Sequence, residues 1–177
     1  MRWSGAILGV CLGCDALRPC DDDEFVAMQS DFEGYERWRR FDIEPPDPRL
    51  GDGARSVYIN ALPSRDSSSF AQCTMIVKVG ETGSDPTAWL MVAMAKRGGA
   101  YNADGAIGWE WFDLDLSASG VPLIDWRGPT PPEGRGYECA LGEDEVGAEG
   151  VGDCNTCHAA AEDNDFVLDS ALDLRER

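Results

Sequence analysis

The segment Thr-Met-Ile-Val-Lys-Val, which runs from Thr74 to Val79, gives the clearest indication of the fold. Its side chains would point alternately to the two faces of a β-strand, because the side-chain period of a strand is two residues. One face would carry Met75, Val77 and Val79. The other would carry Thr74, Ile76 and Lys78. The alternation therefore predicts an apolar strand that carries a single lysine.

Three further segments are predicted to be strands, and turn residues separate most of them. They are residues 56–62, 88–95 and 109–114. The first and the last alternate, whereas residues 88–95 are almost continuously apolar, as a strand buried on both faces would be. Gly98 and Gly99 follow soon after this segment, so it is too short to be a typical helix. We therefore expect a mainly antiparallel β-sheet.

Helical segments are predicted on either side of these strands. Residues 21–40 place apolar side chains at helical spacing, which indicates a helix that packs on the core. These side chains are Phe25, Met28, Phe32, Tyr35 and Trp38. Residues 117–152 are rich in Gly, Pro and acidic residues and are predicted to form a long surface loop. A short helix is expected to begin at Cys154, so the predicted fold class is α+β.

The composition limits the function as well as the fold. A chain of 177 residues, 43% of them hydrophobic, can form one ordinary domain with a core. Its formal net charge of −18 would repel the phosphates of nucleic acid, so nucleic-acid binding is not expected. The same charge suits docking to a basic redox partner, and it equally suits solubility alone.

The N-terminus resembles a bacterial lipoprotein signal. A basic start is followed by a mostly apolar stretch, and Cys14 stands where a lipid anchor would be attached. The alternative is a buried N-terminal helix. If the N-terminus is an export signal, residues 1–14 form that signal, residues 15–24 are a linker and residues 25–177 form one domain. The protein would then be periplasmic or anchored to the membrane outside the cytoplasm.

Residues 154–158 read Cys-Asn-Thr-Cys-His, the C-x-x-C-H attachment motif of a c-type haem. The thiols of Cys154 and Cys157 could form thioethers to one porphyrin, and the imidazole of His158 could bind its iron from the proximal side. His158 is also the only histidine in the chain, which excludes ligation of the iron by two histidines of one chain. The sequence therefore predicts haem c as the cofactor.

Other interpretations of the motif stay open. C-x-x-C could be a redox dithiol, although no βαβ pattern precedes it, or half of a zinc site. A second pair with the required spacing is present at Cys11 and Cys14, and the motif could also be coincidental. In an oxidising compartment Cys73 and Cys139 could form a disulfide, which would leave Cys20 without a disulfide partner. The sequence does not fix this pairing.

The residues after the motif resemble the cytochrome P460 / cytochrome c′-beta family. Its members follow C-x-x-C-H with a short spacer and an Asp-aromatic-Val segment, which here is Asp165-Phe166-Val167. Further blocks resemble the family in the same order along the chain. They are Trp38, residues 57–60, residues 74–78, residues 95–102 and residues 108–109. The resemblance covers residues 25–175.

The resemblance implies a homodimer and a pentacoordinate haem iron with His158 proximal and an open distal side. It implies that this iron binds nitric oxide or oxidises hydroxylamine. The alternative is a non-catalytic electron-transfer or gas-binding cytochrome like cytochrome c′-beta. Methionine is the other common cytochrome ligand, but Met75, Met91 and Met94 lie in apolar strands, where core packing is expected.

Lys78 stands where cytochrome P460 proteins have a lysine that forms an extra covalent link to the porphyrin. Such a link would make Lys78 part of the catalytic site, whereas c′-beta relatives lack the link. A lysine on the solvent face of the strand would place its stem along the sheet instead. The family's distal carboxylate cannot be placed from the sequence, although Asp104 and Glu110 are available.

Overall fold

The computed structural model describes residues 24–43, 54–132, 137–138 and 151–176. The predicted export signal, including Cys14, and the cysteines Cys20 and Cys139 lie outside the described residues. Within the described part of the chain, no helix combines the length and the apolar character that a bilayer crossing requires.

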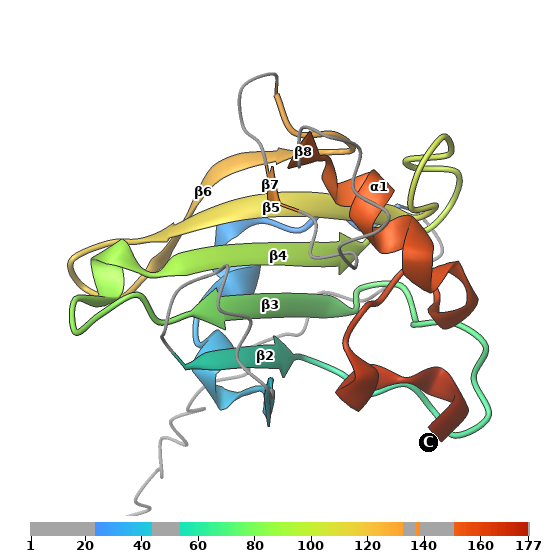
Figure 1. The fold of residues 1–177 in the computed structure, drawn as a ribbon, viewed down its shortest axis with the longest axis horizontal. Helices are drawn as coiled ribbons and strands as arrows, with labels where there is room; N and C mark the ends of the chain where they lie inside the picture. The colour runs from blue at the N-terminus through green and yellow to red at the C-terminus, as the bar shows by residue number, and fades with distance from the viewer. Residues whose placement is uncertain (1–23, 44–53, 133–136, 139–150, 177) are drawn as a thin grey trace, which may run out of the picture.

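Six antiparallel strands form one sheet in which each strand pairs with its neighbours in sequence, in the order β1-β2-β3-β4-β5-β6 (Figure 1). Their bounds are β1 Arg39–Asp42, β2 Arg55–Ile59, β3 Met75–Gly80, β4 Leu90–Lys96, β5 Trp109–Leu116 and β6 Pro122–Gly128. The predicted α+β class with a mainly antiparallel sheet is therefore confirmed. Four of these strands, β2 to β5, lie at the predicted segments because their apolar residues alternate or run continuously there.

The sheet buries both faces, and a different end of the chain covers each (Figure 1). The first face packs on the N-terminal segment through Ala27, Phe32, Tyr35, Met75, Val77, Val79, Met91, Ala93, Ala95, Phe112 and Leu114. The second face packs on the C-terminal segment through Val57, Ile59, Phe70, Ile76, Met94, Ala106, Trp109, Trp111, Val167, Leu172 and Leu174. Two-sided burial explains why β4 is almost wholly apolar.

The predicted N-terminal helix is wrong in its described part. Residues 29–32 (η1, Gln29–Phe32) and 35–37 (η2, Tyr35–Arg37) form two 3₁₀ turns, and β1 follows at Arg39. Gly34 separates the turns in a left-handed conformation, with a φ of 72°, which interrupts helical geometry. Phe32 and Tyr35 are nevertheless buried, so the apolar stripe does pack on the core.

The predicted loop over residues 117–152 is also corrected, because it contains β6. This strand pairs with β5 from Trp111 to Leu116, with a β-bulge between Asp113 and Leu114. Two short strands, β7 (Tyr137–Glu138) and β8 (Val151–Gly152), pair with each other before the C-terminal segment.

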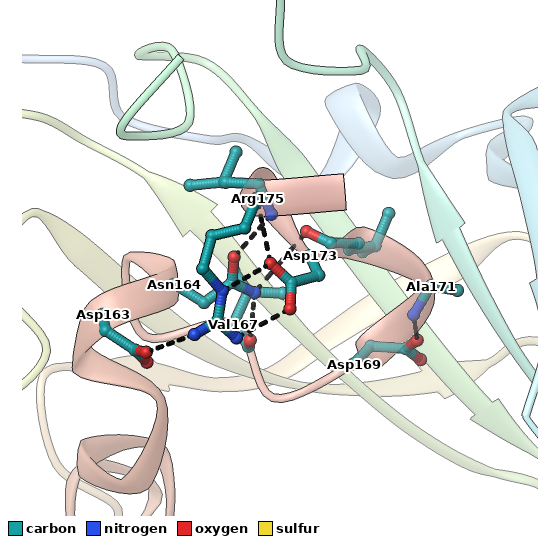
Figure 2. Close-up of polar contacts among 9 residues, drawn as sticks. Asp163, Asn164, Val167, Asp169, Ala171, Asp173 and Arg175 are labelled. Carbon is teal, nitrogen blue, oxygen red and sulfur yellow. Dashed lines mark hydrogen bonds and ion pairs between the residues drawn. The ribbon is translucent and has the colours of Figure 1, made fainter. Parts of the chain in front are cut away.

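The C-terminal segment consists of one helical turn and several 3₁₀ turns. They are α1 (Cys154–His158), η5 (Ala159–Asn164), η6 (Ser170–Leu172) and η7 (Leu174–Glu176), and η4 (Pro86–Ala88) precedes β4. Asn164 is 5% exposed and fixes the segment from its centre, as Figure 2 shows. Its Nδ2 donates to the carbonyl of Val167 at 2.6 Å, and its Oδ1 accepts from the amide of Leu174 at 2.8 Å. Irregular backbone is thus held against the second face by side-chain hydrogen bonds.

Candidate functional site

The C-x-x-C-H residues form α1, a short helix that begins where Asp153 accepts hydrogen bonds from Thr156. The Asp153 carboxylate accepts from the backbone amide of Thr156 at 2.7 Å and from its hydroxyl at 2.8 Å. Such an N-cap fixes the start of a helix. Within one turn, residues three and four apart lie on the same side, so Cys154 shares a side with Cys157 and His158.

His158 is held between the sheet and the C-terminal segment. Its ring lies 4.5 Å from the ring of Trp111 on β5, measured between centroids. Its Nδ1 lies 2.6 Å from the carbonyl oxygen of Phe166. A carbonyl can only accept, so the neutral ring carries its proton on Nδ1 and leaves the lone pair of Nε2 available to a metal.

The pKa of His158 is lowered to about 4. Burial is the main cause because it disfavours the imidazolium, and the positive charge of Lys78 lowers the pKa further. The hydrogen bond to Phe166 opposes both effects. A neutral imidazole is the form that binds metal ions, so His158 is ready to act as a ligand at neutral pH.

Lys78 lies on the same face of the sheet as His158. It pairs across the sheet with Val57 of β2 and Val92 of β4, and cross-strand partners share a face. Trp111, which contacts His158, occupies the neighbouring row of that face with Met94. The partly buried Lys78 therefore points to the side of the sheet where α1 lies, rather than into the first core cluster.

A carboxylate and a thiol also lie on the face of the sheet that α1 covers. Asp113 of β5 lies in the same cross-strand row as Lys78, with Val92 between them. Cys154 packs against the second core cluster, and burial raises the pKa of its thiol to about 12, with the carboxylates of Asp153 and Asp113 adding to the effect. A thiol with so high a pKa is a poor nucleophile, which argues against a reactive redox dithiol.

Cys157 is disulfide-bonded in the structure, as is Cys73, whereas Cys154 is free. The predicted pairing of Cys73 with Cys139 involves a residue outside the described part of the chain. A sulfur in a disulfide cannot also form a thioether, so Cys157 would have to be reduced before it could hold a haem.

Asn155, a variable position of the motif, was missed by the sequence analysis. Its Oδ1 accepts from the Trp111 indole at 2.9 Å, from Asn102 at 2.8 Å and from the amide of Ala106 at 3.1 Å. A Cβ on Gly105 would lie 2.3 Å from the Asn155 side chain, so only glycine fits there. The asparagine thereby fixes α1 to β5 and to the loop before it. No feature of the sequence marks this role.

The two carboxylates considered from the sequence do not lie at the site. Glu110 is 3% exposed and faces the first core cluster, where both its oxygens accept from Arg127 at 2.8 and 2.6 Å. Asp104 is exposed in the loop before β5. Asp113, which the sequence analysis did not single out, is the carboxylate that shares a face with Lys78.

The methionines considered as alternative iron ligands are buried, as expected. Met75 and Met91 belong to the first core cluster, on the opposite face of the sheet from His158. Met94 is on the same face as His158 but is 5% exposed within the second cluster.

The residues fit a haem c in most respects. The half-buried His158 offers its Nε2, Cys154 offers a free thiol on the same side of α1, and Lys78 and Asp113 lie in the adjoining part of the sheet. The disulfide of Cys157 is the one disagreement. Among the described residues, no three His, Cys, Asp or Glu side chains gather as a metal site. The chain matches no protein-family model, no curated protein and no solved structure, so its function is inferred from the chemistry of these side chains.

Proposed function

We propose that the chain is an exported c-type haem protein of the cytochrome P460 type, with a pentacoordinate iron that binds nitric oxide or oxidises hydroxylamine. Cys154 and Cys157 hold the haem through thioethers, and His158 binds the iron. Lys78 lines the haem edge and is the candidate for a covalent link to it. The observation that carries the proposal is His158, whose Nδ1 is bonded to Phe166 and whose Nε2 is left for a metal.

The arrangement of charges around the motif supports this proposal. Lys78, Asp113 and Cys154 come from three distant parts of the chain, and all three lie on the face of the sheet that α1 covers. Lys78 and Asp113 are each partly buried on this face, so their charges lie beside its apolar side chains. A haem would bring an iron and two propionates, which interact with both kinds of charge.

The chemistry supplied by a bound haem would be ligation of a small nitrogen compound at iron and transfer of its electrons. The residues of the chain would do the rest. Asp113 would accept a proton from a substrate on this face, and Trp111 would exclude water beside His158. Asp113 therefore replaces Asp104 and Glu110 as the candidate for proton transfer.

An absorption spectrum of the protein, matured with c-type haem machinery, tests this function. We expect covalent haem with a high-spin, five-coordinate spectrum and tight binding of nitric oxide. A ferrous Soret band shifted strongly to the red would indicate the Lys78 link, and Lys78→Ala would then abolish the shift. An unshifted band that Lys78→Ala leaves unchanged, without hydroxylamine oxidation, would favour the gas-binding alternative.

A second function rests on the disulfide of Cys157. If that bond persists in the mature protein, the motif is a structural cross-link and the chain is a non-haem protein. Mass spectrometry of the purified protein separates the two. A peptide that contains residues 154–158 carries haem in the first case and a disulfide partner in the second.

A further inference from the structure

Lys96 and Asp165 form a buried ion pair next to the candidate site. The Nζ of Lys96 lies 2.6 Å from Oδ1 of Asp165, and the two side chains are 12% and 11% exposed. The Nζ also donates to the carbonyl of Ile107 at 3.2 Å and lies 4.9 Å from the ring centroid of Trp109. A buried ion pair is weak evidence for stability, because apolar residues of similar volume often stabilise as well. Its position therefore needs another explanation.

The pair fixes a short segment of unusual backbone. Oδ2 of Asp165 accepts from the amide of Phe70 at 2.9 Å. The backbone carbonyl of Asp165 accepts from the indole of Trp109 at 2.8 Å. Asp165 and Phe166 have φ angles of 52° and 65°, in the left-handed region that side chains other than glycine rarely adopt. Such conformations persist only where the surroundings impose them.

This backbone presents the carbonyl of Phe166 to His158. The amide of Phe166 donates to the carbonyl of Ala161 at 2.8 Å, so both ends of this residue are fixed. Its carbonyl oxygen then lies 2.6 Å from Nδ1 of His158. If the left-handed turn relaxed to an extended conformation, the peptide group would rotate and the carbonyl would leave the ring.

We infer that the Lys96–Asp165 ion pair positions the proximal histidine: it holds the Phe166 carbonyl on Nδ1 of His158 and so selects the tautomer whose Nε2 binds a metal. Lys96 and Asp165 are positioning residues, since they act on His158 through the carbonyl of Phe166. The identity of the metal rests on the proposed function. The selection of the tautomer depends only on residues of this chain.

Nitrogen-15 NMR of the imidazole in the haem-free protein tests the inference, and one histidine in the chain makes the signals unambiguous. We expect a single tautomer, protonated on Nδ1, in the wild type. Asp165→Asn should give both tautomers in comparable amounts, because a neutral amide forms no ion pair with Lys96 and its single oxygen replaces two acceptors, one for Lys96 and one for the Phe70 amide. Asp163→Asn is the matched control: it removes an exposed ion pair with Arg175, 2.7 Å long, from the same segment (Figure 2) and should change nothing.

The double variant Lys96→Met/Asp165→Asn removes both charges, so that neither is left buried alone. Mixed tautomers in this variant, with a native circular dichroism spectrum, support the inference. A single Nδ1-protonated tautomer in both variants overturns it. Failure of both variants to fold also overturns it, since the pair would then be needed for folding rather than for positioning. Lys96→Arg, which keeps the positive charge opposite Asp165, should keep the single wild-type tautomer.

A second readout uses the haem-loaded protein. A strong hydrogen bond on Nδ1 makes a ligating imidazole more basic. The iron–histidine stretching band in the resonance Raman spectrum should therefore move to lower frequency in Asp165→Asn and stay unchanged in Asp163→Asn. If the wild type takes up no haem, the proposed function fails while the tautomer experiment still decides the role of the ion pair.

Discussion

The ammonium of Lys78 on β3 lowers the pKa of His158 in α1, although the two residues are far apart in the sequence. Both lie on the face of the sheet that the C-terminal segment covers. The relationship is electrostatic and exists before any cofactor is attached. It can therefore be measured in the protein without haem.

Lys78→Met should raise the pKa of His158, because it removes a positive charge that disfavours the imidazolium. The pKa should stay below its ordinary value, since burial is the larger cause of the depression. An NMR titration of the single histidine measures the change. Arg40→Met is the control, because Arg40 pairs with Tyr58 at the edge of the first face. An unchanged pKa in Lys78→Met would contradict the placement of Lys78 beside the imidazole.

The haem-free protein should lose stability as the pH falls below about 6.5. The folded state holds the pKa of His158 at about 4, against its ordinary value of 6.5, so between these values the unfolded chain binds more protons. The contribution is fully present above pH 6.5, is lost progressively toward pH 4, and amounts to on the order of 3 kcal/mol. Urea unfolding of the wild type and of His158→Gln, compared at several pH values, separates the contribution of His158 to the free energy of unfolding from that of the carboxylates. Parallel curves for the two proteins would refute it.

Asn155→Ala should detach α1 from the sheet. It leaves the buried indole nitrogen of Trp111 without its acceptor, which typically costs about 1–3 kcal/mol. Gly105→Ala should also lower the stability of the protein, because the added Cβ would overlap the Asn155 side chain. Gly80→Ala is the matched control, since its Cβ would meet only Leu90 at 3.8 Å. Thermal unfolding measures all three. Equal midpoints for Gly105→Ala and Gly80→Ala would show that the contact is unimportant.

Met94→Ala should leave the absorption spectrum of the haem-loaded protein almost unchanged. Met94 is packed in the second core cluster, so we expect its side chain to contribute to core packing and not to bind the iron. The variant should instead lower the unfolding midpoint, because a buried Met→Ala change typically costs about 2–5 kcal/mol. Conversion of a six-coordinate wild-type spectrum to a five-coordinate one would identify Met94 as a ligand and favour an electron-transfer cytochrome.

The strands could be predicted from the sequence because alternation reports burial directly. The two-residue period of a strand predicts that Lys78 and Ile76 share a face of the sheet, and in the structure they do. The N-terminal segment was predicted wrongly because helical spacing of Phe32 and Tyr35 does not reveal the left-handed turn at Gly34. Strand β6 was missed because Pro, Gly and acidic residues surround its apolar positions.

The positions that surround His158 depend on tertiary contacts that no local pattern contains. Asn155 occupies a variable place in the motif, yet it bonds to residues of three other segments. Phe166 contributes its carbonyl rather than its side chain, so its residue type gives no indication of the role. Asp113 resembles any acidic residue of a strand until the sheet register places it beside Val92 and in the same row as Lys78.

The most direct measurement of the central claim is covalent haem in the purified protein after co-expression with c-type haem machinery. Haem staining of a denaturing gel and the mass of the 154–158 peptide report it. We predict one haem on the wild type and none on Cys154→Ala/Cys157→Ala, with a known c-type cytochrome from the same cells as the positive control. A wild-type chain that carries no haem and retains the Cys157 disulfide, while the control cytochrome is loaded, would contradict the account.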